Sequence, residues 1–449
     1  MFKVKRSKKI KKHFIAHKKR YFIILGILIL VIILGGGIGS YFYFQDKQKP
    51  IIQEEKNIYI SFLSEVYDKI KENYWNKMSD EELSLLFKLA AEKMTTKTQE
   101  VSPPSKEGLS NMIENIIKEM DETKKKQFSA QLAHLVLLNL KPFGRSALYV
   151  KKDEESLKNK VQNINPQENL YADLGINDTA SEEELKEAYR QKVNELDDQT
   201  TEEAKQQLEK IKYAYEVLSN AENKKRYDQT RTEPTVFGEL VQPDILRLYI
   251  SKISPTTLDD LKKETEKFDN TAGLNTLILD LRDNIGGSLD ILQYLLGPFI
   301  GPNRYAFEIF QQGNYDPLKT KFGWLPSLVR YKRVVILANE KTQSSAEVMA
   351  ATLKKYNVGV LVGTKTKGWG TIEKVYEIEN QIDPNEKYSI FLVNHLTIRD
   401  DNQPIEGVGV EPTINTEDKN WKNKLNEYFN YKELNDAVEK VWDTPPGKI

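Results

Sequence analysis

The sequence contains no cysteine among its 449 residues, and it contains only four histidines. The absence of cysteine excludes disulfide bonds, thiol catalysis and cysteine-ligated metal sites. His13 and His17 lie in a basic N-terminal stretch, which leaves His134 and His395 for the rest of the chain. A histidine-based metal cluster is therefore not expected. Since no nucleotide-binding motif occurs either, the sequence predicts no metal and no cofactor.

A formal net charge of zero hides an uneven distribution of charge. Residues 1–20 hold ten Lys or Arg and no Asp or Glu, while the remainder holds 56 basic and 66 acidic residues. The remainder therefore has a formal net charge of −10. An acidic body disfavours nucleic acid as a partner, and we expect none.

An uncharged run of residues, 21–44, follows the basic stretch. A helix of this length reaches about 36 Å, enough to cross a bilayer, and aromatic residues stand at both of its ends, as in membrane-interface belts. The run predicts one transmembrane helix, with residues 1–20 as a basic cytoplasmic head. Residues 45–56 then form a connector, and the rest of the chain is expected on the extracytoplasmic side of the cell membrane.

Residues 57–160 have the pattern of a helical segment. Phe62, Val66, Ile70 and Tyr74 recur at helical spacing and predict one buried face. A second helix is expected to begin after Ser79, because Glu82 three residues later completes the pattern of a capping box. Two further helical stretches are expected near 109–120 and 123–140.

Residues 166–230 are expected to form a separate all-α unit, a hairpin of two long helices closed by a short third helix. The segments "LYADLGI", "ASEEELKEAYR" and "AYEVLSNAENKKRYD" resemble a J domain, the module by which co-chaperones engage the seventy-kilodalton heat-shock chaperone. The family works through a His-Pro-Asp tripeptide after its first long helix. An ungapped alignment puts Asp197, Asp198 and Gln199 there. We therefore expect a J-like spacer or docking module that does not stimulate the chaperone, from which the predicted membrane topology would also separate it.

Residues 231–449 alternate between apolar strand patterns and amphipathic helices. The strands include "LNTLILDLRDN", "RVVILANE" and "VGVLVG", each rich in Ile, Leu or Val. This alternation predicts an α/β core with mostly buried strands.

Two turns of this core carry groups suited to acyl chemistry. Gly286 and Gly287 follow one strand and expose backbone N–H groups, and Ser344 follows another strand at the start of a helix. A serine at a helix start is either a simple N-cap or a nucleophile whose oxyanion is held by nearby N–H groups.

Taken together, these segments resemble the C-terminal processing peptidases, or tail-specific proteases. "LILDLRDNIGGSLD" is similar to the family's Leu-Arg-Asn-Asn-Pro-Gly-Gly segment, with Ile285 in place of Pro, and "IEGVGVEPTI" resembles its closing strand. The resemblance covers most of residues 57–160 and 231–415 and implies a catalytic α/β core with a helical cap. The family usually carries a PDZ domain before the core. Here the J-like unit stands in that place.

The resemblance assigns roles residue by residue. Ser344 stands at the nucleophile position, and Trp369 stands 25 residues later at the position of the general-base lysine. Glu373 stands at the position of a supporting glutamine. The oxyanion donors would be the N–H groups of Ser345 and of either Gly286 or Gly287.

An indole nitrogen only donates a hydrogen bond, so Trp369 cannot accept the serine proton. Lys367 is the leading substitute base, with Lys365 and His395 as weaker alternatives. We therefore expect a pseudopeptidase that binds peptides or proteins. An active serine endopeptidase using Ser344 and Lys367 is the first alternative, and an adaptor acting through the J-like unit is the second.

Overall fold

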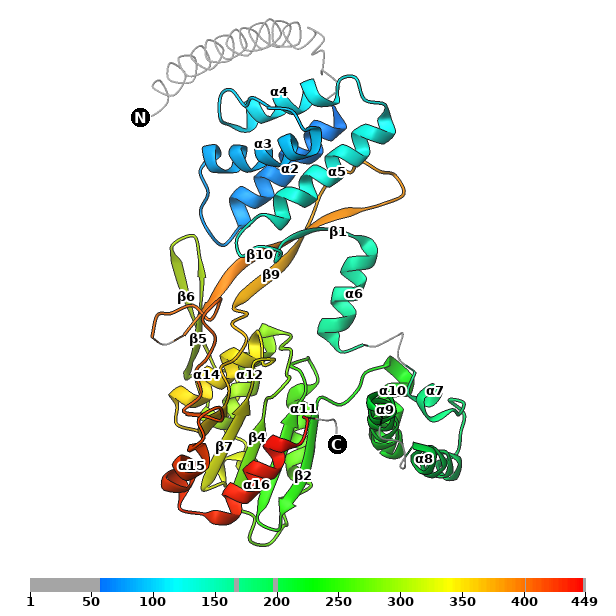
Figure 1. The fold of residues 1–449 in the computed structure, drawn as a ribbon, viewed down its shortest axis with the longest axis vertical. Coiled ribbons are helices and arrows are strands. Elements are labelled where there is room, and N and C mark those ends of the chain that lie inside the picture. Colours follow the sequence, from blue (N-terminus) through cyan, green and yellow to red (C-terminus); the bar gives the residue numbers. More distant parts are fainter. Residues whose placement is uncertain (1–56, 165–168, 197–200, 400, 447–449) are drawn as a thin grey trace, which may run out of the picture. The chain divides into compact units, whose positions relative to one another are not determined.

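The computed structural model describes residues 57–164, 169–196, 201–399 and 401–446. It begins with a helical part formed by α2 (Ile58–Asn73), α3 (Asp80–Thr95), α4 (Lys106–Ile117) and α5 (Glu122–Leu138) (Figure 1). The capping box predicted at Ser79 is confirmed. The Ser79 hydroxyl accepts from the Glu82 N–H at 3.1 Å, and the Glu82 carboxylate accepts from the Ser79 N–H at 2.8 Å. The face predicted on α2 is also buried, since Phe62, Val66 and Ile70 are fully covered.

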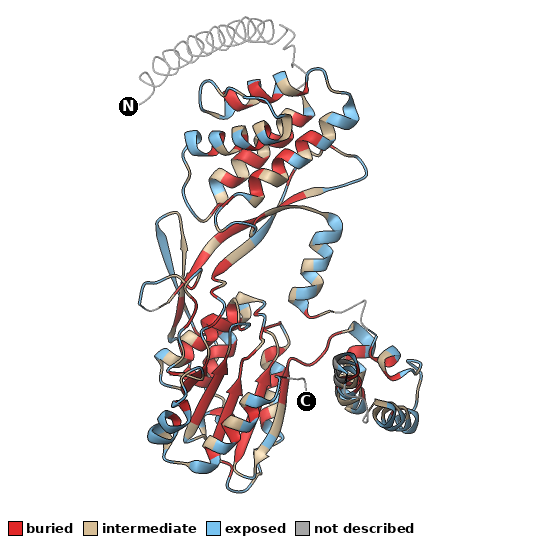
Figure 2. Ribbon diagram, viewed as in Figure 1, coloured by how far each residue is buried: buried red, intermediate tan, exposed pale blue. Residues whose placement is uncertain are grey.

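The α/β core contains a six-stranded sheet of order β11-β8-β7-β4-β3-β2. Its strands are parallel except for the β2–β3 hairpin. Every residue of β3, β4 and β8 is buried, which confirms the predicted core of mostly buried strands (Figure 2). The strand bounds are β2 (Val236–Gln242), β3 (Ile245–Ile250), β4 (Thr276–Asp280), β7 (Arg333–Ala338), β8 (Val360–Gly363) and β11 (Ile414–Asn415).

Helices cover both faces of this sheet (Figure 1). One face packs against α11 (Thr257–Glu266), α12 (Leu289–Ile300), α13 (Pro326–Val329) and α14 (Ser345–Lys355). The other face packs against α15 (Trp421–Phe429) and α16 (Lys432–Asp443). This arrangement explains why the strands read as continuous apolar runs, because neither of their faces meets water.

A second, antiparallel sheet of five strands links the helical part to the core. The long strand β10 (Tyr388–Ile398) pairs with β1 (Ala147–Val150), with β9 (Thr371–Glu377) and with β5 (Tyr305–Gln311). Strand β6 (Asn314–Lys319) pairs with β5. Buried residues of β10 such as Ile390 and Leu392 belong to the same apolar cluster as α2–α5.

The J-like unit follows helix α6 (Lys151–Gln162), which has no buried residue (Figure 2). The unit consists of α7 (Leu170–Leu174), α8 (Glu182–Leu196), α9 (Glu202–Ser219) and α10 (Ala221–Thr230). The two ends of the insertion meet, since Ile164 forms a β-bridge with Thr232 and the Asn163 amide donates to the Glu233 carbonyl at 2.7 Å. Phe237 of β2 and Tyr249 of β3 complete the unit's buried cluster.

The predicted location in a membrane is corrected by the structure. No helix within the described ranges, from residue 57 to residue 446 with their gaps, is long and apolar enough to cross a bilayer. The helix expected at 21–44, with its basic head 1–20 and connector 45–56, lies outside the described residues.

Candidate active site

The parallel sheet brings the two sequence-predicted turns together. Strands β4 and β7 are parallel neighbours, with Leu279 beside Ile336, so the turns that follow them lie at the same edge of the sheet. The closeness is shown by Gly286, where an added Cβ would lie 2.7 Å from the Cβ of Ser344 and 3.0 Å from the Ser345 nitrogen. Ser344 and the glycine turn therefore form one site, as expected from the sequence.

Ser344 has an unusual backbone conformation, with φ of 58° and ψ of −131°. A positive φ is uncommon for a residue with a side chain. The Ser344 N–H donates to the Glu347 carboxylate at 2.9 Å, but the hydroxyl makes no capping hydrogen bond. Ser344 is the N-cap residue of α14 by position, and it also lines a cavity.

Glu347 holds this turn against the segment that carries Trp369. Its carboxylate is fully buried and accepts hydrogen bonds from the Ser344 N–H, the Thr366 hydroxyl, and the N–H groups of Gly368 and Trp369 at 2.5–2.9 Å. Burial raises the pKa of the Glu347 carboxyl, while these hydrogen bonds act in the opposite direction. The sequence pattern did not single out this residue, because its partners lie some twenty positions away in the chain.

The cavity at Ser344 has a volume of about 400 Å³. It is lined by residues of the predicted site together with one histidine: Ser344, Ser345, Gly287, Trp369, Glu373 and His395. Leu157 and Val161 of α6 form part of its wall. The structure thus gathers the predicted nucleophile and both substituted positions around one space.

The side chains of Trp369 and Glu373 interact with each other. Burial raises the pKa of the Glu373 carboxyl, and hydrogen bonds from Thr371 and Trp369 partly offset this effect. The Thr371 hydroxyl lies 2.5 Å from the carboxylate. Arg145 stacks on the indole of Trp369 with its guanidinium carbon 3.3 Å from the ring centroid. The indole is therefore held by a cation stacked on its ring.

The candidate substitute bases differ in their positions. Lys367 is exposed, lies 5.5 Å from the Trp369 ring centroid and is not among the residues that line the cavity. Lys365 is exposed and forms an ion pair with Glu411 at 2.8 Å. His395 does line the cavity. The cavity also contains Lys374, which the sequence reasoning missed.

His395 has features of a proton acceptor. Its Nδ1 is buried and has no hydrogen-bond partner among the described residues. Burial lowers the pKa of the His395 imidazole, and the nearby Lys374 lowers it further. A lowered pKa keeps the imidazole neutral near pH 7, the state in which one ring nitrogen can accept a proton.

The two glycines differ as candidate oxyanion donors. The Gly286 N–H is occupied, because it donates to the Asn284 side chain at 2.8 Å. The Gly287 N–H donates no hydrogen bond within the described part of the chain, and Gly287 lines the cavity. Ser345 is the first residue of α14, whose initial N–H groups have no intrahelical acceptor. The geometry therefore favours Gly287 and Ser345 as the pair of donors.

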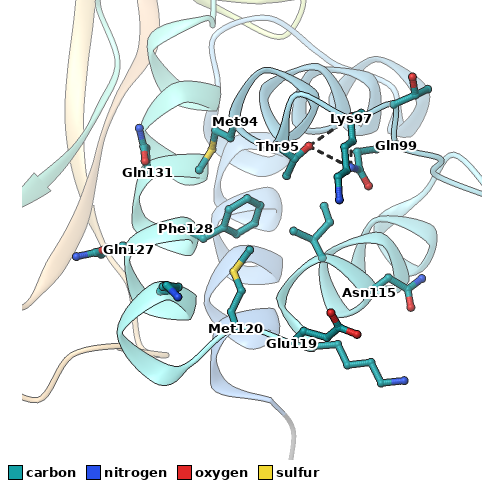
Figure 3. Close-up of a pocket in the computed structure, with 14 residues that line it drawn as sticks. Met94, Thr95, Lys97, Gln99, Asn115, Glu119, Met120, Gln127, Phe128 and Gln131 are labelled. Carbon is teal, nitrogen blue, oxygen red and sulfur yellow. Dashed lines mark hydrogen bonds between the residues drawn. The ribbon is translucent and has the colours of Figure 1, made fainter.

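A larger cavity of about 790 Å³ lies between α3, α4 and α5 (Figure 3). Its lining includes Met94, Met120 and Phe128 and none of the residues predicted for catalysis. The tripeptide position of the J-like unit, Asp197 to Gln199, lies outside the described residues. No group of three His, Asp or Glu side chains suited to a metal ion occurs in the ranges that the structure covers.

Comparison with known proteins identifies both domains. Residues 244–416 match peptidase family S41, and residues 169–228 match the DnaJ domain. The carboxy-terminal processing protease CtpA of Bacillus subtilis (strain 168) is 27% identical over 184 residues, which cover 41% of this chain and 37% of that protein. The chloroplastic carboxyl-terminal-processing peptidase 3 of Arabidopsis thaliana is 26% identical over 181 residues, covering 39% of this chain and 32% of that protein.

Two solved structures resemble the whole chain more loosely. The photosystem II D1 C-terminal processing protease has a TM-score of 0.46 at 13% identity, covering 80% of this chain and 93% of its own. A lipoprotein from Streptococcus agalactiae has a TM-score of 0.40 at 14% identity, covering 82% and 96%. The chain spans only about a third of the length of the curated relatives named above. Through residues 244–416 the chain is similar to the C-terminal processing proteases of peptidase family S41, and residues 169–228 match a DnaJ domain.

Proposed function

We propose that this protein is a pseudopeptidase of the C-terminal processing protease family, which binds peptides or unfolded protein segments at Ser344 without hydrolysing them. The observation that carries the proposal is Trp369. By the resemblance of spacing it occupies the position of the general base, and its indole nitrogen can only donate a hydrogen bond, so it cannot accept the serine proton.

The loss of a base accounts for the loss of turnover. A serine hydroxyl is a weak nucleophile until a neighbouring group takes its proton. Removing a general base costs about 10²- to 10⁴-fold in rate, and more when nucleophile and base act as a unit. Lys367 does not compensate, because it is exposed and does not line the cavity.

Features suited to binding remain. The N–H groups of Gly287 and Ser345 are available to a peptide carbonyl, and the cavity of about 400 Å³ accommodates side chains. Among the described strands, β9 pairs only with β10, so its other edge is open to an added strand beside the cavity. Extended peptides commonly bind by adding a strand to such an edge.

A second candidate function, slow hydrolysis at Ser344, is favoured by one observation. The His395 imidazole lines the same cavity, and its Nδ1 has no partner among the described residues. If His395 accepts the proton of Ser344, His395→Gln abolishes any Ser344-dependent cleavage while leaving peptide binding in place.

For the J-like unit we propose a docking role rather than chaperone stimulation. Its Arg226 pairs with Asp260 of α11, a carboxylate that is only 4% exposed and also accepts from Thr235 at 2.8 and 2.9 Å. The tripeptide position is Asp197–Gln199 rather than His-Pro-Asp. An ATPase assay of the heat-shock chaperone with the full chain tests this role, and a several-fold stimulation would contradict it.

Peptide binding is tested with an unstructured fluorescent peptide. We expect saturable binding by fluorescence anisotropy, with the peptide recovered intact by mass spectrometry. Leu318→Trp adds bulk at a half-buried residue of the cavity wall, whereas Tyr315→Trp introduces the same residue at an exposed site on the same strand. Only the first variant should weaken binding. No binding to the wild type, or equal binding to both variants, would refute the proposal.

A further inference from the structure

Glu373 places a carboxylate in the cavity without a cation bound to it. It accepts a hydrogen bond from the Thr371 hydroxyl at 2.5 Å, and within the described residues it forms no ion pair. The charge of Arg145 also acts on Glu373, but its guanidinium already pairs with Glu406 at 3.3 Å and stacks on Trp369. A carboxylate that is largely removed from water gains most from a charged hydrogen-bond donor.

The groups around Glu373 favour a positively charged ligand. Asp290, in the first turn of α12, adds a second acidic side chain to the cavity lining, and Lys374 is the cationic residue of that lining. His395 adds no charge in its neutral form. Trp369 contributes an aromatic ring beside the carboxylate, and Arg145, stacked on it at 3.3 Å, shows that this ring attracts guanidinium groups.

The cavity also has an unsatisfied polar group. The Ser345 hydroxyl has no hydrogen-bond partner within the described residues, although Ser345 is only 1% exposed and lines the cavity. Buried hydroxyl groups normally have partners, and one without a partner at a cavity surface indicates that a ligand supplies it. This observation is independent of the acidic side chains and points to the same space.

We propose that the cavity recognises a lysine or arginine side chain of the bound peptide, which inserts against Glu373 and Trp369. This inference rests on the proposed peptide-binding function and specifies which peptide side chains the cavity prefers. At these two positions the resemblance implies lysine and glutamine, so an amine has been replaced by an aromatic ring and a neutral amide by a carboxylate. The exchange removes an amine from the cavity wall and adds a carboxylate that can pair with a cation.

The test compares N-acetylated, C-amidated peptides that differ at one central position, which is lysine, arginine, norleucine or glutamate. We expect the wild type to bind the lysine and arginine peptides at least about tenfold more tightly than the norleucine peptide, as for a charge-assisted hydrogen bond. Glu373→Gln should reduce this ratio to about twofold or less, chiefly by weakening the two basic peptides. Glu377→Gln, an exposed substitution on the same strand, should leave the ratio unchanged.

The outcomes separate this inference from the function on which it rests. If no peptide binds, the proposed function fails. If all four peptides bind equally well, or if Glu373→Gln preserves the preference, the function stands and the cation site is refuted. The preference measured in the wild type alone decides the matter if Glu373→Gln does not fold. A norleucine peptide with a free amino terminus that binds as tightly as the acetylated lysine peptide would overturn the assignment to a side chain.

Discussion

The guanidinium of Arg145 lies flat against the indole of Trp369, with its central carbon 3.3 Å from the ring centroid. Arg145 is held in turn by Glu406 at 3.3 Å, and Glu406 also accepts from the Gly370 N–H at 2.8 Å. Trp369 is therefore part of a network that includes the loop before β1 and the segment after β10. These neighbours pack around an aromatic ring. They therefore fit a tryptophan at this position, in agreement with the proposed loss of the general base.

Restoring the residues that the family resemblance implies should restore some catalysis. In Trp369→Lys with Glu373→Gln, the neighbouring Arg145 would disfavour a charged amine and so keep the new lysine neutral enough to accept a proton. We expect slow peptide cleavage, at a stability cost of roughly 1–3 kcal/mol for the lost ring packing. Mass spectrometry of peptide products measures the cleavage. Adding Ser344→Ala to this variant should abolish it, and persistent cleavage would mean that another nucleophile acts.

The glycine turn should tolerate no side chain at Gly287. Its φ is 140°, and an added Cβ would lie 2.0 Å from the Ile253 carbonyl oxygen. Gly313 provides a matched control, because its φ is 91° and nothing lies within 4 Å of its added Cβ. Gly313→Ala should cost about 1–2 kcal/mol for backbone strain, and Gly287→Ala about 1–3 kcal/mol more for the clash. Urea unfolding compares the two. Equal losses would mean that the turn relaxes freely.

The docking of the J-like unit should depend on its buried ion pair and not on its exposed one. Arg226→Ala leaves the buried Asp260 without its cation, and we expect a loss of about 2–4 kcal/mol in the local opening of α10, which hydrogen exchange measures. Lys263→Ala removes an exposed pair with Glu222 between the same two helices and should cost about 0–1 kcal/mol. Similar protection in the two variants would argue against docking through Asp260.

The stability of the protein should carry a pH dependence that comes from Glu373. Because burial raises the pKa of this carboxyl in the folded protein, its favourable contribution is complete below the unfolded pKa of about 4.3 and is lost as pH rises through the folded value. The free energy of unfolding of the wild type, relative to Glu373→Gln, should therefore fall between acidic and neutral pH. The titration of Glu347 is common to both proteins and cancels. A difference between the two proteins that stays constant with pH would contradict this assignment.

Features that depend on local sequence were predictable. The capping box at Ser79 forms as its spacing indicates, with hydrogen bonds of 2.8 and 3.1 Å between Ser79 and Glu82. The buried parallel strands were equally clear, since a strand covered on both faces must be apolar throughout. The convergence of Ser344 with the glycine turn follows from strand order, because parallel neighbours end at the same edge.

Features that depend on distant partners were not predictable. Nothing local to Glu347 indicates that its carboxylate binds Thr366 and Gly368. The antiparallel sheet pairs Ile309 with Thr397, and Leu157 of α6 lines the cavity. Neither contact can be predicted from a periodic pattern in the sequence. The sequence indicated His395 only as a weaker alternative base for the same reason, because its position in the cavity depends on the pairing of β10 with β9.

Covalent labelling of Ser344 by a fluorophosphonate tests the central claim most directly, because the reagent reports whether the hydroxyl is activated without requiring a substrate. Intact-protein mass spectrometry of the wild type, Ser344→Ala, and Trp369→Lys with Glu373→Gln would measure the extent of labelling over time. The account predicts no labelling of the wild type beyond that of Ser344→Ala, and slow labelling of the restored variant. Labelling of the wild type that disappears in Ser344→Ala would contradict it and show that a base, with His395 the first to substitute, still serves this serine.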